Sequence, residues 1–322
     1  MILVTGGTGF LGSTLIKFLV DGGAAVIATK REQSAIPEIL RSSSLVQWVD
    51  ADITDYFSLA DLFEGVTKVY HCAAKISYQK EDWASMLHTN VEGTKHIVNL
   101  CLEHGARLVH VSSIAALGER KANELISEKN QWDDGADNSK YALSKYESEM
   151  EVWRGIVEGL DAVIVNPSVI MGVGTGRKGS GVIFELVQKG LKIYPPGTIG
   201  VVDVEDVARV MIMLMNNTEI TGERFVLNSE NLSNKSLLER VAILLEKPAP
   251  RIEAKPFMLG AAWRIAKLVA FIKGTRPTLT RETAQAAASK LAYSNKKITD
   301  TTGYIFKPVD VTLKEMSLQF KP

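Results

Sequence analysis

Short, continuously apolar segments alternate with stretches of helical periodicity from the N-terminus to about residue 227. A strand that is buried on both faces is apolar at every position, and such strands separated by helices are typical of a parallel sheet with helices on each side. The sequence therefore predicts an α/β fold built on a doubly wound parallel sheet. The expected strands are Ile2–Thr5, Ala25–Thr29, Leu45–Val49, Lys68–Cys72, Arg107–Ser112 and Ala162–Asn166.

The composition excludes several other classes of protein. With 46% hydrophobic and 23% charged residues, the chain has ordinary globular usage, unlike a disordered, collagen-like or coiled-coil sequence. Its 37 basic and 37 acidic residues give a formal charge of zero, and two cysteines cannot form a disulfide framework. The start of the chain lacks signal-peptide features, and no uncharged apolar run reaches about 18 residues. We therefore expect a cytoplasmic protein with no nucleic-acid partner and no metal site.

A glycine-rich turn joins the first expected strand to the first helix. Residues 5–12 are Thr-Gly-Gly-Thr-Gly-Phe-Leu-Gly, in which Gly6 permits a tight turn, Gly9 lets the backbone approach a diphosphate, and Gly12 lets the helix pack close to the strand. Backbone N–H groups and the positive end of the helix dipole favour phosphate there. A turn without a ligand is the alternative, but the strand–turn–helix context favours a dinucleotide. The predicted contacts are Gly6, Thr8, Gly9, Phe10, Leu11 and Gly12.

The end of the second strand bears on which dinucleotide is bound. An acid at this position binds the ribose 2′-hydroxyl of NAD, whereas a basic residue accommodates the 2′-phosphate of NADP. The strand ends in Lys30-Arg31, which favours NADP, although both could be solvated surface charges and Glu32 is adjacent. NAD therefore remains an alternative. Asp52, after the third strand, could lie near the adenine or could cap a helix.

A phenol and an ammonium, those of Tyr141 and Lys145, lie four residues apart in a helical stretch and therefore share one face. A free phenol has a pKa near 10, and a nearby Lys⁺ is expected to lower that pKa so that the tyrosine can exchange a proton with a carbonyl or hydroxyl. The same spacing at Tyr293 and Lys297 is interpreted as coincidence. Tyr141, in contrast, follows a strand that ends in Ser112-Ser113, and α/β sites form at the carboxyl ends of such strands.

Together these motifs resemble the extended short-chain dehydrogenase/reductase family, whose members include NAD(P)-dependent epimerases and dehydratases. The resemblance covers about residues 1–230. Residues 29–31 are similar to the dihydroflavonol-reductase and hydroxysteroid-dehydrogenase-like branch, in which an arginine at the position of Arg31 meets the NADP phosphate. The resemblance is carried by Gly6, Gly9, Gly12, Asp52-Ile53, His71-Cys72-Ala73-Ala74, Asn90, Ser112-Ser113, Tyr141, Lys145 and Asn166-Pro167.

This resemblance implies a Rossmann-like fold, an NAD(P)-dependent enzyme and a role for each matched residue. Tyr141 would be the acid/base and Lys145 its partner, while Asn90 would support the catalytic network. Ser113 would polarise the substrate, because the family's active hydroxyl stands five residues before a glycine, here Gly118. The cofactor would be lined by Lys30, Arg31, Asp52, Ile53, Ala73, Ala74, Lys75, Ser112, Tyr141, Lys145, Asn166, Pro167 and Val169.

The domain organisation is expected to be interleaved. Residues 1–166 form the predicted NADP-binding Rossmann domain, to which 200–227 return, beginning with a strand at Val201–Val204. Residues 167–199 and 228–322 form a smaller, mostly helical substrate-binding lobe. The helical segments 83–102 and 137–153 could pair in a homodimer, or could simply cover the sheet.

One part of this lobe is strongly basic. Residues 247–297 contain eleven basic and two acidic residues, a net +9 in a chain whose total is zero. Within it, the apolar stretch Phe257–Ile272 could lie on an anionic membrane surface or cover a pocket. A packed helix whose cations reach solvent is the favoured interpretation.

The favoured function is an NADP-dependent oxidoreductase that interconverts a carbonyl and an alcohol on a mid-sized, fairly apolar small molecule. A nucleotide-sugar epimerase or dehydratase with tightly bound NAD is the first alternative, but the arginine typical of that branch is missing from Val163–Pro167. The second alternative is a non-catalytic dinucleotide-sensing regulator. Such relatives lack the Tyr–Lys pair that this chain has.

Overall fold

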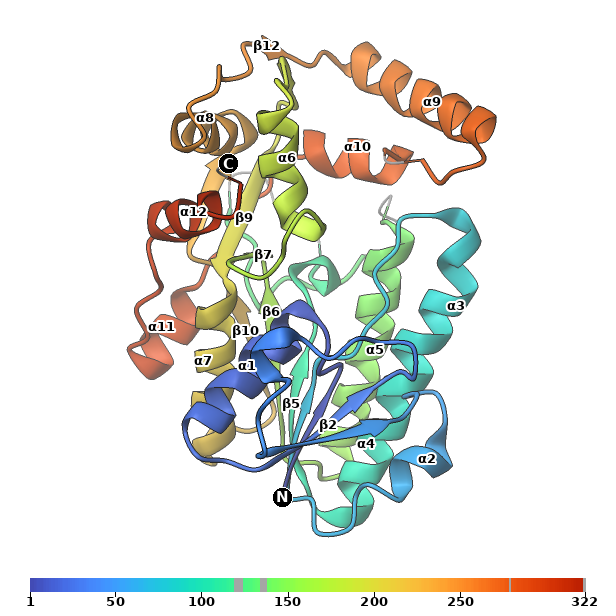
Figure 1. The fold of residues 1–322 in the computed structure, drawn as a ribbon. Helices are drawn as coiled ribbons and strands as arrows, with labels where there is room; N and C mark the ends of the chain where they lie inside the picture. Colours follow the sequence, from blue (N-terminus) through green and yellow to red (C-terminus); the bar gives the residue numbers. More distant parts are fainter. Residues whose placement is uncertain (119–123, 134–137, 278, 321–322) are drawn as a thin grey trace.

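The computed structural model describes residues 1–118, 124–133, 138–277 and 279–320. Its centre is a seven-stranded sheet in the order β10-β6-β5-β4-β1-β2-β3, with every neighbouring pair parallel (Figure 1). The predicted doubly wound parallel sheet is therefore confirmed. The strands are β1 (Ile2–Thr5), β2 (Val26–Lys30), β3 (Val46–Asp50), β4 (Lys68–His71), β5 (Arg107–Val111), β6 (Ala162–Pro167) and β10 (Glu223–Leu227).

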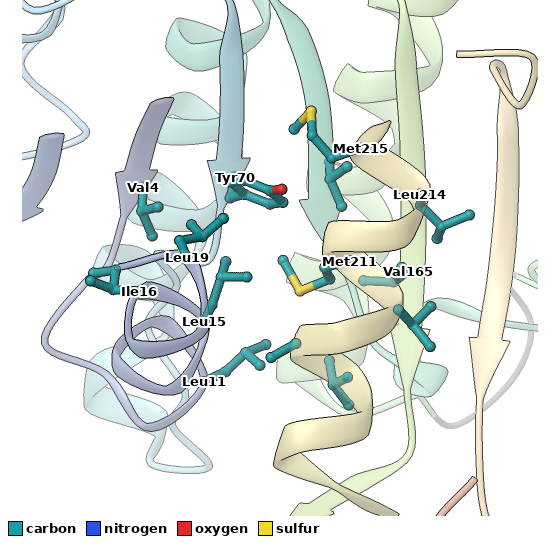
Figure 2. Close-up of a cluster of buried hydrophobic side chains, with 14 of the residues drawn as sticks. Val4, Leu11, Leu15, Ile16, Leu19, Tyr70, Val165, Met211, Leu214 and Met215 are labelled. Carbon is teal, nitrogen blue, oxygen red and sulfur yellow. The ribbon is translucent and has the colours of Figure 1, made fainter. Parts of the chain in front are cut away.

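Helices cover both faces of this sheet because each strand is apolar on both sides. In β6, Ala162 and Ile164 point to one face, and Val163 and Val165 point to the other. Helices α1 (Phe10–Asp21) and α7 (Val204–Asn216) cover the second of these faces. Figure 2 shows Leu11, Leu15 and Met211 directed toward one another between these two helices.

The opposite face carries α4 (Gly93–His104) and α5 (Lys140–Val157), with the short helix α2 (Tyr56–Ala60) at one end. Helix α3 (Trp83–Leu87) continues into α4 through a π-helical turn at His88–Glu92. Helices α4 and α5 pack against each other. Pairing of segments 83–102 and 137–153 across a two-fold axis stays a prediction, and residue 137 lies outside the described residues.

A second unit sits beyond the carboxyl edge of the sheet. A three-stranded sheet is formed by β7 (Val169–Met171), β9 (Thr198–Asp203) and β11 (Glu230–Ser233). It packs around its own apolar core with the helices α6 (Val182–Gln188), α8 (Asn234–Leu244) and α12 (Val309–Ser317). Strands β8 (Ile193–Tyr194) and β12 (Ile252–Glu253) form a short pair. The other helices of this unit and its surroundings are α9 (Pro256–Lys273), α10 (Arg281–Ala288) and α11 (Lys296–Thr302).

Two expectations need correction here. The strand expected at Val201–Val204 is β9, which pairs with β7 and β11 and does not join the central sheet. Since a single residue, Ser168, separates β6 from β7, the chain leaves the central sheet there and offers β7 as a partner outside it. Within segment 200–227, only β10 joins the central sheet, and α7 packs on one of its faces. The packed-helix interpretation of Phe257–Ile272 is also wrong, because most large apolar side chains of α9 are exposed and have little core to cover.

Candidate active site

The parallel strands bring the predicted site residues to one edge of the sheet. Gly6 follows β1, Arg31 follows β2, Ala73 follows β4 and Ser113 follows β5, while Asn166 lies at the end of β6. Because the carboxyl ends of parallel strands meet at the same edge, residues distant in sequence become neighbours there. This is the edge at which open α/β sheets bind ligands.

The glycine turn has the shape that a diphosphate needs. Gly6 has φ +68°, and a Cβ there would lie 2.8 Å from the Cα of Ala73. A Cβ on Gly12 would lie 2.3 Å from the carbonyl oxygen of Gly6. Gly9, the N-cap of α1, has no side chain to occupy the helix N-terminus, and no acid stands in the first turn. The backbone can therefore meet phosphate oxygens directly, so these residues fit a dinucleotide.

The remaining residues of the turn differ in what they can offer. Thr8 lies in the turn itself, whereas the Leu11 side chain is buried in the core, leaving its backbone as the group that can contact a ligand. The ring of Phe10 lies beneath the loop after β7, since a Cβ on Gly172 or Gly174 would lie 3.4 or 3.6 Å from it.

The two cations at the end of β2 have different surroundings. Lys30 forms an ion pair with Asp50, its register partner at the end of β3. Arg31 is exposed just beyond the strand, and its charge contributes to holding the pKa of Asp52 below its ordinary value. The charge of Lys30 is thus already balanced within the protein. Arg31 is the cation more available to an anionic ligand.

Asp52 and Ile53 lie after β3 and are engaged with the protein. The backbone N–H and the hydroxyl of Thr54 donate to Asp52 Oδ1, at 2.9 and 2.8 Å, and the backbone hydrogen bond is the main cause of the lowered Asp52 pKa. The N-cap of α2 is Asp55, so Asp52 stabilises a turn before the helix and does not cap it. Ile53 is buried against Gly93 of α4.

The side chains of Ser113 and Tyr141 lie near each other. Tyr141 lies in the first turn of α5, whose N-cap Ser139 accepts a hydrogen bond from the Ala142 N–H at 3.0 Å. Ser113 follows β5, and its side chain lies near enough to Tyr141 for hydrogen bonding to act toward a lower pKa of the phenol. The ring of Tyr78 lies 5.6 Å from that of Tyr141, centroid to centroid. Two hydroxyl-bearing side chains are thereby held near each other beside an aromatic wall.

The protonation of this pair differs from the expectation. Burial raises the pKa of Tyr141 above its usual value, the nearby Tyr78 raises it further, and the hydrogen bond from Ser113 only partly offsets this. The predicted lowering of the Tyr141 pKa by Lys145 is therefore wrong for this structure. Lys145 Nζ instead donates to the Val111 carbonyl at 2.9 Å. Tyr141 consequently keeps its proton at neutral pH, as a proton donor must.

The charge of Lys145 depends on a single described carboxylate. Burial lowers the pKa of Lys145 to about 8, and Glu149, one helical turn further along α5, acts in the opposite direction. The neighbouring His71 is neutral, since burial and then the charge of Lys145 lower its pKa to about 3. Lys145 thus remains mostly protonated at neutral pH.

Glu149 was not anticipated from the sequence, yet it connects much of the site. Its buried carboxylate accepts hydrogen bonds from Ser112 Oγ (2.5 Å), Asn166 Nδ2 (2.8 Å) and Trp153 Nε1 (3.2 Å), and it pairs with Arg224 of β10 at 2.9 Å. Ser112 is therefore directed to Glu149, whereas Ser113 contacts Tyr141. The available signal was spacing, because Tyr141, Lys145 and Glu149 follow one another at four-residue intervals on one helix face.

Asn90 and Asn166 hold backbone segments in place. Asn90, in the π-helical turn, accepts from the Lys75 N–H at 2.8 Å and donates to the Lys75 carbonyl at 3.0 Å and to Ser144 Oγ at 3.1 Å. Asn166 also donates to the Ser113 carbonyl at 3.0 Å. Asn90 thereby fixes the loop after β4, which contains the exposed Ala74, to α5. Of the other predicted cofactor contacts, Pro167 ends β6 and the half-buried Val169 begins β7.

The second Tyr–Lys pair has no comparable arrangement. Tyr293 is buried and precedes α11, whereas Lys297 lies within α11, pairs with Glu223 and donates to the Arg224 carbonyl at 2.8 Å. The two residues do not share a helix face, which agrees with the interpretation of their spacing as coincidence.

Comparison with known proteins identifies the family. The model of the NAD dependent epimerase/dehydratase family matches residues 2–227. The chain belongs to this family. It is an NAD(P)-dependent enzyme of the extended short-chain dehydrogenase/reductase type, which confirms the resemblance found in the sequence.

Several relatives carry the name of a reductase, and one is named a sterol demethylase protein. The chain is 31% identical over 265 residues to sterol demethylase protein B of Methylococcus capsulatus, covering 80% of this chain and 78% of that one. It is 29% identical over 311 residues to a Synechocystis protein provisionally named dihydroflavonol 4-reductase (93% and 88% covered). It is 29% identical over 238 residues to cinnamoyl-CoA reductase 1 of Petunia hybrida (69% and 71%).

Solved structures share the fold over nearly the whole chain. The crystal structure of gox2253 superposes with a TM-score of 0.85 at 27% identity, covering 99% of this chain and 97% of that one. UDP-glucose 4-epimerase from Thermus thermophilus, in complex with NAD, has a TM-score of 0.78 at 20% identity, with 99% and 98% covered. At that identity the second comparison concerns the fold alone.

The electrostatic effect of Glu149 on Lys145 predicts a measurable change in the pKa of Lys145. In Glu149→Gln the buried ammonium loses its anionic partner, so the pKa of Lys145 should fall below its value of about 8. Carbon-13 NMR of lysine-labelled protein, with the Lys145 signal assigned through Lys145→Arg, would follow the titration. Glu147→Gln, on the same helix, should leave the midpoint unchanged. An unchanged midpoint in folded Glu149→Gln protein would contradict the role given to this carboxylate.

Proposed function

We propose that this chain is an NADP-dependent oxidoreductase that interconverts a carbonyl and an alcohol on a mid-sized, fairly apolar small molecule. The observation that carries the proposal is the placement of Ser113 and a protonated Tyr141 near each other on the sheet edge that also bears the glycine turn. The reductase names of several relatives support the same reaction type.

In this proposal the residues of the chain position the substrate and move a proton. Bound NADPH would supply the hydride to the carbonyl carbon. The hydroxyls of Ser113 and Tyr141 hold the carbonyl oxygen, and the Tyr141 proton is transferred to that oxygen as the C=O π bond is lost. Lys145, one helical turn away, would contact the nicotinamide ribose and so position the cofactor beside Tyr141. In the reverse direction, the phenolate accepts the alcohol proton.

The cofactor would be held by residues of the sheet edge. The glycine turn and the N-terminus of α1 face the diphosphate, and Arg31 meets the 2′-phosphate. Ala73 to Lys75 and Asn166 to Val169 line the remainder, with Lys145 near the nicotinamide ribose. The exposure of Arg31, and the absence of an acid at the end of β2, support NADP over NAD.

The substrate would lie between the two units, in line with the predicted division into a Rossmann domain and a substrate-binding lobe. Segment 75–82 follows β4, and its Tyr78 borders Tyr141. This segment is tied to the C-terminal part, since Gln79 Nε2 donates to the Pro277 carbonyl at 2.8 Å and Arg276 pairs with Asp82 at 2.8 Å. These contacts place residues after α9 at the rim of the candidate site.

Replacement of the proposed proton donor tests the reaction. Tyr141→Phe keeps the ring and its packing but removes the proton, so turnover should fall by about 10²–10⁴-fold while NADPH binding is retained. The assay is loss of NADPH absorbance with a carbonyl compound selected by screening wild-type protein. Tyr146→Phe, on the same helix, should retain activity. Turnover of Tyr141→Phe within about twofold of wild type would refute the assignment.

Single variants at the end of β2 test the cofactor preference. Arg31→Ala should weaken NADPH binding by about 10–100-fold, the value of one or two hydrogen bonds to a charged group, and leave NADH binding nearly unchanged. Lys30→Ala should have a smaller effect because Lys30 is engaged with Asp50. Fluorescence titration of the purified protein measures both. Equal losses for NADPH and NADH in Arg31→Ala would argue against the proposed contact, and NAD retained through purification would favour the epimerase alternative.

A further inference from the structure

Helix α9 turns a row of large apolar side chains toward solvent. We call this row, Phe257, Ile265, Leu268, Phe271 and Ile272, the apolar stripe. Its members are between 59% and 84% exposed, and their spacing places them on one side of the helix. On the opposite side, Ala270 is buried and Leu259 and Ala266 are half-buried. The helix thus packs against the protein through a few, mostly small side chains. Its most hydrophobic side faces solvent.

The segment that contains the apolar stripe is rich in basic residues and has no acidic residue. Residues 254–281 contain no Asp or Glu, and three of the cations lie on α9 itself. Arg264, Lys267, Trp263, Leu268 and Phe271 line a shallow recess on the helix surface, with the Arg264 guanidinium 4.5 Å from the centre of the Trp263 ring. The basic residues of this segment are Lys255, Arg264, Lys267, Lys273, Arg276 and Arg281.

The helix also has a position suited to contact with a large surface. Figure 1 shows α9 at the periphery of the molecule, with α10 beside it and the central sheet far away. Among the described residues, no helix is long and apolar enough to cross a membrane. A helix with this combination of exposed apolar and basic residues can lie along a bilayer interface.

We propose that α9 docks the protein on an anionic lipid surface. The apolar stripe enters the boundary between headgroups and acyl chains, and Arg264 and Lys267, which lie on or beside the stripe, contact lipid phosphates. Charge complementarity selects this partner over a second copy of the chain. A symmetric dimer through α9 would bring the cations of residues 254–281 against the same cations of the other copy, which is unfavourable.

Docking would place the candidate site close to the lipid boundary. The connector after α9 contacts segment 75–82 through Arg276–Asp82 and Gln79–Pro277, and that segment contains Tyr78. An apolar substrate could then enter from the lipid phase. This consequence rests on the proposed function, whereas the lipid binding itself does not.

Sedimentation of the full-length protein with lipid vesicles tests the proposal. Wild-type protein should sediment with mixed phosphatidylglycerol/phosphatidylcholine vesicles at low salt, much less with pure phosphatidylcholine, and less again as salt is raised. The triple variant Ile265→Ser/Leu268→Ser/Phe271→Ser should bind at least about tenfold more weakly, as should Arg264→Glu/Lys267→Glu. Since these side chains are largely exposed, thermal unfolding and NADPH binding should match those of wild type.

The matched control removes apolar side chains from other surfaces. Phe57 and Ile305 are 81% and 89% exposed, and Phe57→Ser/Ile305→Ser should bind vesicles as wild type does. The proposal is overturned if wild-type protein does not sediment with anionic vesicles at low salt, or if the control loses as much binding as the triple variant. It is also overturned if wild-type protein does not bind vesicles but forms a dimer in sedimentation velocity, and the triple variant abolishes that dimer. Absence of turnover with every carbonyl tested would leave these readouts intact.

Discussion

The buried carboxylate of Glu149 is the interaction on which the candidate site most depends. A charge removed from water is stable only when hydrogen bonds and an opposite charge replace hydration. Here they come from the residue after β5, from β6 and β10, and from α5 itself. The same carboxylate faces Lys145 along the helix, so the contacts that join the strands also help to keep that ammonium charged. One carboxylate therefore both joins the strands and opposes the effect of burial on the pKa of Lys145.

The protonation of the Tyr141–Lys145 pair shows how burial can outweigh sequence spacing. Four-residue spacing places both side chains on one helix face, but it carries no information about how deeply each is buried or which atom the ammonium contacts. In the folded chain, desolvation raises the pKa of the phenol and lowers that of the ammonium. The phenol therefore keeps its proton at neutral pH, and the ammonium keeps most of its charge.

Local patterns were enough to predict the sheet, the glycine turn and the residues at the carboxyl edge of the sheet. Strand hydrophobicity and turn chemistry depend on residues that are close together in the sequence. Pairings that depend on tertiary register were not accessible. Glu149 and Arg224 are 75 residues apart, Lys30 finds Asp50 only because β2 and β3 are neighbours, and β9 leaves the central sheet because of where β7 begins. The exposure of the α9 side chains could not be predicted either, because an apolar sequence does not show whether other elements of the fold will pack against it.

The distribution of charge connects this exposed helix to the rest of the molecule. Residues 247–297 carry a net +9, so the remainder carries an equal negative charge. Near an anionic surface such a separation favours one orientation, with α9 toward the lipid and the acidic remainder toward water. Because the connector after α9 is bound to the segment that carries Tyr78, this orientation would also turn the rim of the candidate site toward the surface. Solvent-facing apolar side chains, basic flanks and proximity to the site thus lead to the same geometry.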